Sequence, residues 1–498
     1  MKLSGNIFIN GEWLDGTGDL WQSLNPYDET VLGSGNCVCH REVDYAVITA
    51  KAAFDKWSFL SYQTRKEYVL RFRDLLESHA DAFAEQIAKE SGKVLWECTQ
   101  EVAAMIGKID LSIQAYEERC APKSFAFNDS IMNKTRYKAM GVMVVFGPFN
   151  LPGHLPNGHI VPALLAGNTV VFKPSLETPL VGEFMIRLWA EVGLPGGVIS
   201  LLQGGSLIGK ELVKHPFVDG ILFTGSSAVG KSIHRSLGGS PHKMLALEMG
   251  GNNPLLVGNI LHADNLASFA YHTIQSAFIT SGQRCVCARR LILVRSSLSQ
   301  SFVRCLIKMT ESLLCGGWKD QPSPFMGPVI SQNAGRFILG AYEDLLKQSG
   351  SKVLVEMNCT DGNQARLNPA IVDVTGIEKR KDEEIFGPLL QLILVDDFKE
   401  ALFEANQTEY GLAAGLLSAD EKEYEEFLFH SRAGIINYNR PTTGASGASP
   451  FGGVGSSGNF RPSGYFASDY CSYPVSSMES MDLELPEKLI PGVERIEL

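Results

Sequence analysis

The sequence predicts an α/β fold made of two doubly wound α/β domains and a small β arm. Short apolar runs of strand length alternate with segments of helical length, and this alternation occurs in two separate series. Buried strands separated by one helix each are typical of parallel βαβ units with helices on both faces of the sheet. A chain of 498 residues is also longer than one hydrophobic core usually holds.

The amino-terminal segment is expected to be helical before the first sheet begins. Apolar residues recur at helical spacing between residues 42 and 118, with a second amphipathic run from Arg65 to Lys89. The polar stretch 121–138, which contains Asp129 and Ser130, predicts a hairpin or arm that stands off the main body. The first series of strands follows, at residues 142–146, 169–172, 198–202 and 220–223.

A second series of apolar runs begins after residue 252 and predicts the second domain, with a crevice between the two. Its strands are expected at residues 255–257, 291–294, 392–395 and 435–437. The tail from about residue 470 is too polar for a core strand, so we expect it to pair with the polar arm or with another subunit.

Composition excludes several classes of protein. The formal net charge is −11 without a long basic run, which argues against nucleic acid as a partner, because phosphate neutralisation needs clustered Lys and Arg. Ten cysteines in a chain of this length are too few for a disulfide scaffold and indicate reduced thiols. The amino terminus lacks an apolar signal region, and no apolar stretch is long enough to cross a bilayer. These observations predict a cytoplasmic protein without a membrane partner.

Cys285 is the first candidate for chemistry. A nucleophilic cysteine must be a thiolate, and Arg284 adjoins Cys285 as a cation that lowers a thiol pKa. Gly282 allows the close backbone approach that an oxyanion site needs. The alternative is a buried structural thiol. The cysteine pairs at 285/287 and 37/39 lack partners at ligand spacing, so no metal site is predicted.

Three further motifs carry weaker signals. Glu248 follows an apolar run and precedes two glycines, which fits either a general base at a strand end or a turn whose carboxylate faces solvent; this motif alone favours the turn. Residues 223–230 read as a strand, a glycine loop and a helix, an arrangement that suits a phosphate. Asn150 lies between Pro148 and Pro152 at a strand's carboxyl edge, where ligands bind in open sheets.

Taken together and in this order, the motifs resemble the aldehyde dehydrogenase superfamily, and the resemblance runs from about Phe8 to Pro486. The matching stretches are Gly147–Asn150, Lys173–Ser175, Phe223–Ser226, Leu247–Gly251, Gly282–Cys285, Glu384–Pro388 and Pro450–Gly453. The resemblance implies a Rossmann-like dinucleotide-binding domain (residues 1–120 and 139–248) and a catalytic domain (249–445). Residues 121–138 and 470–498 would form an oligomerisation arm and tail of a homodimer or homotetramer.

The resemblance also implies catalytic roles. Cys285 would add to the aldehyde carbon, while the side-chain amide of Asn150 and the backbone amide of Cys285 hold the oxyanion. Hydride would leave to a nicotinamide, and Glu248 would activate the water that hydrolyses the thioester.

The cofactor is expected to be held by a larger set of residues. Lys173 would bind the adenosine ribose, Glu384 the nicotinamide ribose, and Phe386 would support the nicotinamide ring. Gly230 would permit close helix packing beside the pyrophosphate loop. The remaining loop residues in this prediction are Gly225, Ser226, Ser227, Ala228 and Val229.

One departure from the family pattern affects the choice of cofactor. Many members have a glutamate three residues after the lysine, where it binds the ribose hydroxyls and repels a 2′-phosphate. This sequence has Leu176 there and an acid one residue later, at Glu177. The absence of a carboxylate at position 176 weakens the case for a strict preference for NAD over NADP. NAD stays the expected cofactor, with NADP as an alternative.

Three longer stretches resemble the N-succinylglutamate 5-semialdehyde dehydrogenases of arginine catabolism: Phe149–Pro162, Gly282–Arg290 and Gly452–Ser463. This resemblance implies a small anionic aldehyde, with backbone amides and cations to receive its carboxylates. The residues expected to do so are Thr443, Gly444, Ala445, Arg284, Arg440 and Arg461, although each arginine fits a structural salt bridge equally well. His154 and His159 are expected to be structural or to line the substrate site.

Three alternatives to this function stay open: a dehydrogenase of another semialdehyde such as glutamate 5-semialdehyde, a silent NAD-binding protein, and a thiol hydrolase without cofactor.

Overall fold

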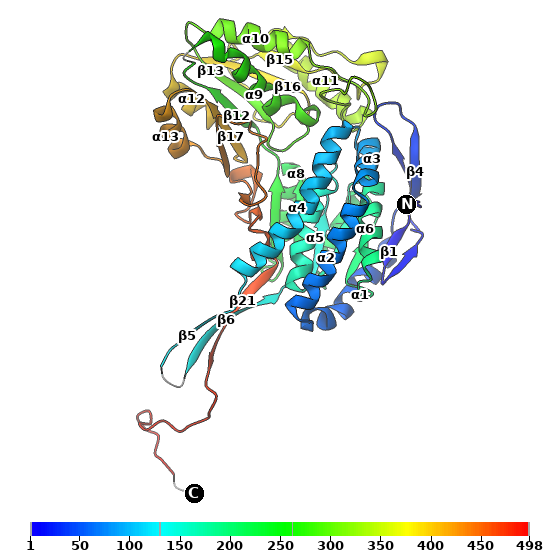
Figure 1. Ribbon diagram of the computed structural model, residues 1–498, viewed down its shortest axis with the longest axis vertical. Coiled ribbons are helices and arrows are strands. Elements are labelled where there is room, and N and C mark those ends of the chain that lie inside the picture. Colours follow the sequence, from blue (N-terminus) through cyan, green and yellow to red (C-terminus); the bar gives the residue numbers. More distant parts are fainter. Residues whose placement is uncertain (1, 129–130, 261, 497–498) are drawn as a thin grey trace.

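The computed structural model describes residues 2–128, 131–260 and 262–496. Figure 1 shows two α/β lobes, one above the other, with a long β arm and a carboxyl-terminal tail that extend from the lower lobe. The predicted fold class, two α/β domains with a small β arm, is confirmed.

The lower lobe contains a seven-stranded sheet in the order β11-β10-β7-β8-β9-β1-β2. Its strands are β1 (Ile7–Ile9), β2 (Glu12–Leu14), β7 (Val142–Phe146), β8 (Thr169–Lys173), β9 (Ile199–Leu201), β10 (Gly220–Gly225) and β11 (Met244–Met249). Strands β7 to β11 are parallel, as expected, whereas β1 and β2 extend the sheet in antiparallel orientation. Its helices are α1 (His40–Phe59), α2 (Tyr62–Ser78), α3 (Ala80–Ser91), α4 (Leu95–Arg119), α5 (His154–Ala166), α6 (Pro179–Val192), α7 (Ser206–Lys214) and α8 (Ser227–Ser236).

Strand β7 explains why this sheet is covered on both faces. All five of its residues are buried and apolar, and successive side chains of a strand point to opposite faces. Val142 and Val144 join the core formed with α1, α7 and α8, whereas Met143 and Val145 join the core formed with α2 to α6. The central strand therefore has no polar face, as a strand between two helical layers requires.

The upper lobe repeats this plan with a sheet in the order β14-β15-β16-β13-β12-β17-β18. Its strands are β12 (Asn253–Val257), β13 (Ala288–Val294), β14 (Lys352–Val355), β15 (Ala370–Asp373), β16 (Leu389–Val395), β17 (Ala413–Leu417) and β18 (Ile435–Tyr438). Its helices are α9 (Leu266–Phe278), α10 (Ser299–Glu311), α11 (Gln332–Leu346), α12 (Phe398–Ala405) and α13 (Glu421–His430), with short 3₁₀ turns at Ala263–Asn265, Ile279–Gly282 and Thr360–Gly362. All four strands expected in this domain are confirmed.

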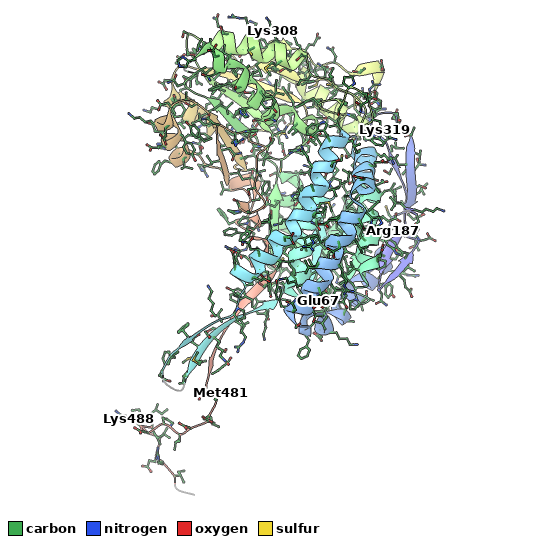
Figure 2. The ribbon with its side chains drawn as sticks, in the orientation of Figure 1. Glu67, Arg187, Lys308, Lys319, Met481 and Lys488 are labelled. Carbon is green, nitrogen blue, oxygen red and sulfur yellow. The ribbon has the colours of Figure 1, made fainter. Side chains whose placement is uncertain are left out.

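The arm is a three-stranded antiparallel sheet in which the tail pairs with the polar stretch. The sequence left two partners open for the tail, this stretch or another subunit, and the structure shows the first. Its order is β21-β6-β5, formed by β5 (Lys123–Ala126), β6 (Met132–Ala139) and β21 (Ser472–Glu479). Asp129 and Ser130 of the predicted arm, and residues 497–498 of the predicted tail, lie outside the described residues. Figure 2 shows Met481 and Lys488 on the tail, clear of both lobes, and Met481 is 97% exposed.

Smaller elements complete the chain. They are the hairpin β3 (Leu20–Leu24) and β4 (Val31–Asn36), the pair β19 (Pro450–Phe451) and β20 (Ser463–Gly464), a 3₁₀ turn at Gly455–Ser457, and α14 (Ala467–Tyr470). No helix in the described part of the chain is both long and apolar enough to span a membrane.

Candidate active site

A cavity of about 1240 Å³ lies between the carboxyl ends of the lower sheet and the loops of the upper lobe. Its α8 end is lined by Lys173, Leu176, Lys210 and the first residues of α8. Its α4 end is lined by residues of α4, by His154 and by the loop 443–447. Three predicted catalytic residues, Asn150, Glu248 and Cys285, line the cavity together.

The loop that carries Cys285 has an unusual backbone. Thr280 and Ser281 both have φ of +55°, and Gly282 has φ of +70°. A side chain at Gly282 would overlap the carbonyl of Gly387, so this position requires glycine. Backbone of this kind persists only where surrounding contacts hold it. Here the Ser281 hydroxyl donates to the Gly327 carbonyl at 2.6 Å.

The surroundings of Cys285 keep its thiol protonated at neutral pH. Burial, followed by the nearby carboxylates of Glu384 and Glu248, raises the pKa of Cys285 to about 12, and Arg289 opposes this shift. The expectation that Arg284 activates the thiol is therefore wrong for this structure. Arg284 instead turns to Glu97, at 3.3 Å, and donates to the Thr280 hydroxyl at 2.8 Å.

Glu248 is buried at the end of β11, so the solvent-facing turn that its motif alone favoured is wrong. The side chain is 5% exposed, and burial raises its pKa well above the usual carboxyl range. Its Oε1 accepts a hydrogen bond from the Ser463 amide at 3.3 Å. Its Oε2 is buried without a hydrogen-bond partner among the described residues. One oxygen of this buried carboxyl group is thus available to a group in the cavity.

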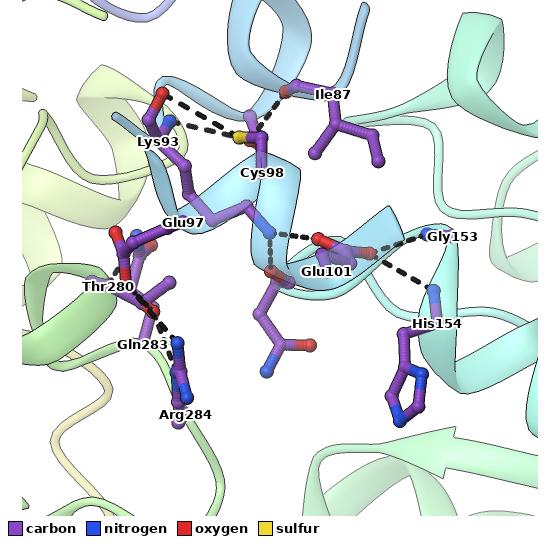
Figure 3. Close-up of polar contacts among 12 residues, drawn as sticks. Ile87, Lys93, Glu97, Cys98, Glu101, Gly153, His154, Thr280, Gln283 and Arg284 are labelled. Atoms are coloured by element: carbon purple, nitrogen blue, oxygen red, sulfur yellow. Dashed lines mark hydrogen bonds and ion pairs between the residues drawn. The ribbon is translucent and has the colours of Figure 1, made fainter. Parts of the chain in front are cut away.

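Helix α4 holds the loop that contains Asn150. The Lys93 ammonium group, just before the helix, donates to the Asn150 carbonyl at 2.9 Å and forms a buried ion pair with Glu101. Glu101 in turn accepts hydrogen bonds from the amides of Gly153 and His154, at 2.9 and 3.0 Å (Figure 3). One ion pair therefore holds the loop after β7 at Asn150 and again where α5 begins.

The same helix also holds the Cys285 loop. Glu97 lies one turn before Glu101 and accepts a hydrogen bond of 2.6 Å from the Thr280 hydroxyl, beside its contact with Arg284 (Figure 3). These contacts join the two loops that bring Asn150 and Cys285 to the cavity. The sequence did not predict any of these three charged residues, Lys93, Glu97 and Glu101. The only available signal was two acids at i, i+4 on an amphipathic helix, a spacing that usually marks an exposed face.

The glycine loop occupies the α8 end of the cavity. Ser226 caps helix α8, its hydroxyl accepting from the Val229 amide at 3.4 Å, and Gly225, Ser226, Ser227, Ala228 and Val229 all line the cavity. Gly230 is outside the lining. A side chain at Gly230 would overlap the Met249 sulfur, so glycine here allows α8 to pack closely on β11. Free amides at a helix amino terminus bind anions such as phosphate.

Lys173 and Leu176 lie at the same end. The Lys173 ammonium group donates to the Gly204 carbonyl at 2.6 Å, and burial lowers its pKa to about 8. Leu176 lines the cavity, whereas Glu177 is outside the lining. The structure therefore presents an apolar side chain, not the neighbouring acid, to this part of the cavity.

Glu384 and Phe386 reach the cavity from the segment just before β16. Glu384 accepts a hydrogen bond from the Gly251 amide at 3.3 Å and lies 3.7 Å from the Arg289 guanidinium. Its carboxylate occupies the space that a side chain at Gly250 would need. The Phe386 ring meets Phe149 edge to face, with centroids 5.8 Å apart. Both Glu384 and Phe386 line the cavity, and Glu384 is among the charges that act on Cys285.

The predicted substrate residues are only partly brought together. Arg284, Thr443 and Ala445 line the α4 end, whereas Gly444, Arg440 and Arg461 are outside the cavity lining. Both Arg440 and Arg461 are exposed, and the Arg461 guanidinium donates to the neighbouring Phe460 carbonyl at 3.4 Å.

The two histidines differ in surroundings. His159 contacts the Tyr470 hydroxyl at 2.8 Å and the Thr224 hydroxyl at 3.1 Å, and burial lowers its pKa to about 3. His159 also lines the cavity, so it is placed for either of the two expected roles, structural or substrate-lining. His154 lines the cavity at the α4 end. Within residues 2–128, 131–260 and 262–496, no cluster of three or more His, Cys, Asp or Glu side chains is placed to hold a metal ion.

Comparison with known proteins adds to this geometry. The pattern described as the aldehyde dehydrogenase family matches residues 13–474. The chain is 48% identical over 488 residues to N-succinylglutamate 5-semialdehyde dehydrogenase of Pseudomonas fluorescens (strain Pf0-1), covering 98% of this chain and 99% of that relative.

Two solved structures have similar folds. An NADP-dependent glyceraldehyde-3-phosphate dehydrogenase from Bacillus halodurans, complexed with NADP, is 29% identical with a TM-score of 0.89, over 97% of this chain and 100% of that one. An indole-3-acetaldehyde dehydrogenase from P. syringae, in complex with NAD+, is 27% identical with a TM-score of 0.90, over 97% of each chain.

Proposed function

The chain belongs to the aldehyde dehydrogenase family, and from that premise we propose that it oxidises N-succinylglutamate 5-semialdehyde to N-succinylglutamate. The observation that carries the reaction type is the meeting of Cys285, Asn150 and Glu248 in one cavity that continues to the amino terminus of α8. The observation that favours this substrate is the 48% identity to an enzyme named for it, over nearly the whole of both chains.

A nicotinamide dinucleotide fits the α8 end of the cavity. The amides at the start of α8 suit its pyrophosphate, and Lys173 suits the hydroxyls of its adenosine ribose. Leu176 supports acceptance of both NAD and NADP, because an apolar side chain does not repel a 2′-phosphate; NAD remains the expected cofactor. When bound, the nicotinamide supplies the acceptor for the hydride.

The first chemical task of the protein is to make and hold a covalent adduct. The Cys285 sulfur bonds to the aldehyde carbon as the thiol loses its proton, for which the Glu248 carboxylate is the base in the same cavity. The Asn150 side-chain amide and the Cys285 backbone amide then donate to the oxyanion. Each such donor is worth roughly 3–4 kcal/mol in the transition state.

The second task is hydrolysis of the thioester left after hydride transfer. Glu248 has the required features: a buried carboxyl group whose raised pKa makes it a stronger base than an exposed one, with Oε2 available to a water molecule. Once the proton from Cys285 has passed from Glu248 to solvent, the Glu248 carboxylate takes a proton from the water as the water oxygen attacks the thioester carbon. The carbon–sulfur bond then breaks, that proton returns to the Cys285 sulfur, and the acid product leaves.

The division of labour among the parts of the chain follows the same proposal. Residues 1–120 and 139–248 bind the dinucleotide, and residues 249–445 carry the nucleophile. The arm and tail (121–138 and 470–498) join subunits of a homodimer or homotetramer. The exposed outer edges of β5 and β21 support this assignment, because an unpaired strand edge can pair with another chain.

A panel of aldehydes assayed with NAD and with NADP tests this function. We expect kcat/KM to be highest for the succinylated semialdehyde, well above that for glutamate 5-semialdehyde and for hexanal. Equal values for the succinylated and unsuccinylated semialdehydes would remove the substrate proposal and leave a dehydrogenase of another semialdehyde. Turnover without any dinucleotide would indicate a thiol hydrolase instead.

A further inference from the structure

The α4 end of the cavity contains charged side chains that are not equally compensated. Glu101 pairs with Lys93, and Glu97 pairs with Arg284, so each of these acids already has a cation. Lys108, two turns beyond Glu101 on the same helix, also lines the cavity. In the part of the chain that the structure describes, Lys108 has no carboxylate at ion-pair distance.

Lys108 is nevertheless buried. It is 4% exposed, and its ammonium group donates to the backbone carbonyl of Gly464. Burial lowers the pKa of Lys108 to about 8. A buried charge with only a neutral partner is costly, and buried charges are ordinarily paired. A cation of this kind on a cavity wall is compensated when an anionic ligand enters.

His154 is a second polar group left without a partner at the same place. Its Nδ1 is buried and has no hydrogen-bond partner within the described residues. Burial lowers the pKa of His154 to about 4, and Lys108 and Arg284 are among the nearby cations that lower it further. The imidazole is therefore neutral and has one N–H to donate. Figure 3 shows the side chain of His154 pointing away from the ion pair of Lys93 and Glu101.

We propose that Lys108, with His154 beside it, binds a carboxylate of the aldehyde substrate and determines the preference for anionic aldehydes. Lys108 then takes the role expected from the sequence for Arg440 and Arg461, which are outside the cavity lining. The loop 443–447 forms another part of the α4 end, and Gly447 faces Leu111 of α4 at close range. A substrate with two carboxylates can thus meet the ammonium group with one and the backbone amides of the loop with the other.

This inference rests on the proposed function, and substitution of Lys108 tests it. Lys108→Gln removes the charge and keeps a donor for the Gly464 carbonyl. We expect KM for the succinylated semialdehyde to rise roughly 10- to 100-fold, as for loss of a charge-assisted hydrogen bond, with kcat within about twofold of the wild type. For hexanal, which has no carboxylate, kcat/KM should stay within about twofold.

Two further variants separate binding from structure. Lys108→Arg keeps the cation and should retain most of the discrimination between the two aldehydes, even if Lys108→Gln folds poorly. Lys210→Gln removes a cation from the α8 end of the same cavity and should leave that discrimination unchanged. An equal fall in kcat for both aldehydes in Lys108→Gln would assign Lys108 to supporting β20, whose Ser463 amide contacts Glu248, and would overturn the proposal.

Inhibition by N-succinylglutamate distinguishes a failure of this inference from a failure of the proposed function. The inhibitor is tested against hexanal oxidation, which does not depend on the identity of the natural substrate. If the wild type fails to prefer the succinylated aldehyde but Lys108→Gln weakens inhibition roughly tenfold or more, only the proposed substrate is wrong. If the wild type prefers the succinylated aldehyde but inhibition by N-succinylglutamate is unchanged in Lys108→Gln, the anion site is elsewhere.

Discussion

The ion pair between Lys93 and Glu101 offers the most direct test of how helix α4 supports the site. Both side chains are almost completely buried, at 3% and 0% exposure, and Lys93 also donates to the Asn150 carbonyl. The perturbation is Lys93→Met, which keeps an unbranched side chain one atom shorter and removes the charge. Glu101 then remains as a buried carboxylate without a cation.

The expected loss of stability can be worked out from these contacts. Removing one partner of a buried ion pair typically costs about 3–5 kcal/mol, because the remaining charge stays desolvated. Glu101 keeps the amides of Gly153 and His154 as donors, so we expect the lower end of that range, about 3 kcal/mol. In Lys93→Met with Glu101→Gln, both charges are gone and an acceptor for these amides remains. That double variant should recover most of the loss.

A second ion pair provides the matched control. Lys89 and Glu85 lie 3.1 Å apart on α3, but they are 36% and 47% exposed. An exposed pair four residues apart on a helix contributes about 0.3–0.5 kcal/mol, so Lys89→Met should be nearly neutral.

The assay is urea unfolding at fixed protein concentration, with kcat measured on the folded variants. Lys93→Met should also lower kcat roughly ten- to a hundredfold, because displacement of the Asn150 loop by about 1 Å costs that much in rate. The reasoning is refuted if Lys93→Met unfolds at the same urea concentration as Lys89→Met, or if the double variant is less stable than the single one.

Three further predictions concern the reacting groups. In the cofactor-free enzyme, the rate at which iodoacetamide alkylates Cys285 should rise about tenfold per pH unit from pH 7 to 10, because the pKa of the thiol is about 12. Glu384→Gln should raise this rate at each pH, because it removes a nearby negative charge. Peptide mass spectrometry measures both rates, and a plateau near pH 8 would contradict the prediction. Glu248→Gln should let a thioester accumulate. In the wild type the deacylation rate should rise with pH as Glu248 ionises, and this rise should be absent from the variant. Unchanged steady-state turnover would indicate another base. Leu176→Glu should raise KM for NADP at least about tenfold more than KM for NAD, and an unchanged ratio of the two would place residue 176 away from the ribose.

The continuous apolar strands could be predicted from the sequence because their pattern reflects burial directly. Residues 142–146 are apolar throughout and form β7. Strand β17, Ala413–Leu417, was missed because alanine and glycine have low strand propensity and nothing local distinguishes them from a loop. Its place between β12 and β18 is decided by tertiary packing alone.

For the candidate site, short motifs predicted the reactive groups next to strands and turns. They did not predict which charged side chains form ion pairs. Cys285, Glu248 and Asn150 each stand in a short motif next to a predicted strand or turn. The state of an arginine or lysine depends on partners far away in the chain: Arg284 meets Glu97, 187 residues before it. Arg284, Arg440 and Arg461 therefore looked equivalent in the sequence, and Lys108 did not stand out.

Helix α4 contacts both the Asn150 loop and the Cys285 loop, and this restricts how the enzyme can be altered. One residue inserted into an α-helix rotates everything beyond it by about 100° and advances it by about 1.5 Å. An insertion between Glu97 and Glu101 would carry one of these acids away from its loop while the other stayed in place. Engineering of new specificities should therefore keep the length of this helix and exchange side chains on its cavity face, beginning with Ala104 and Lys108.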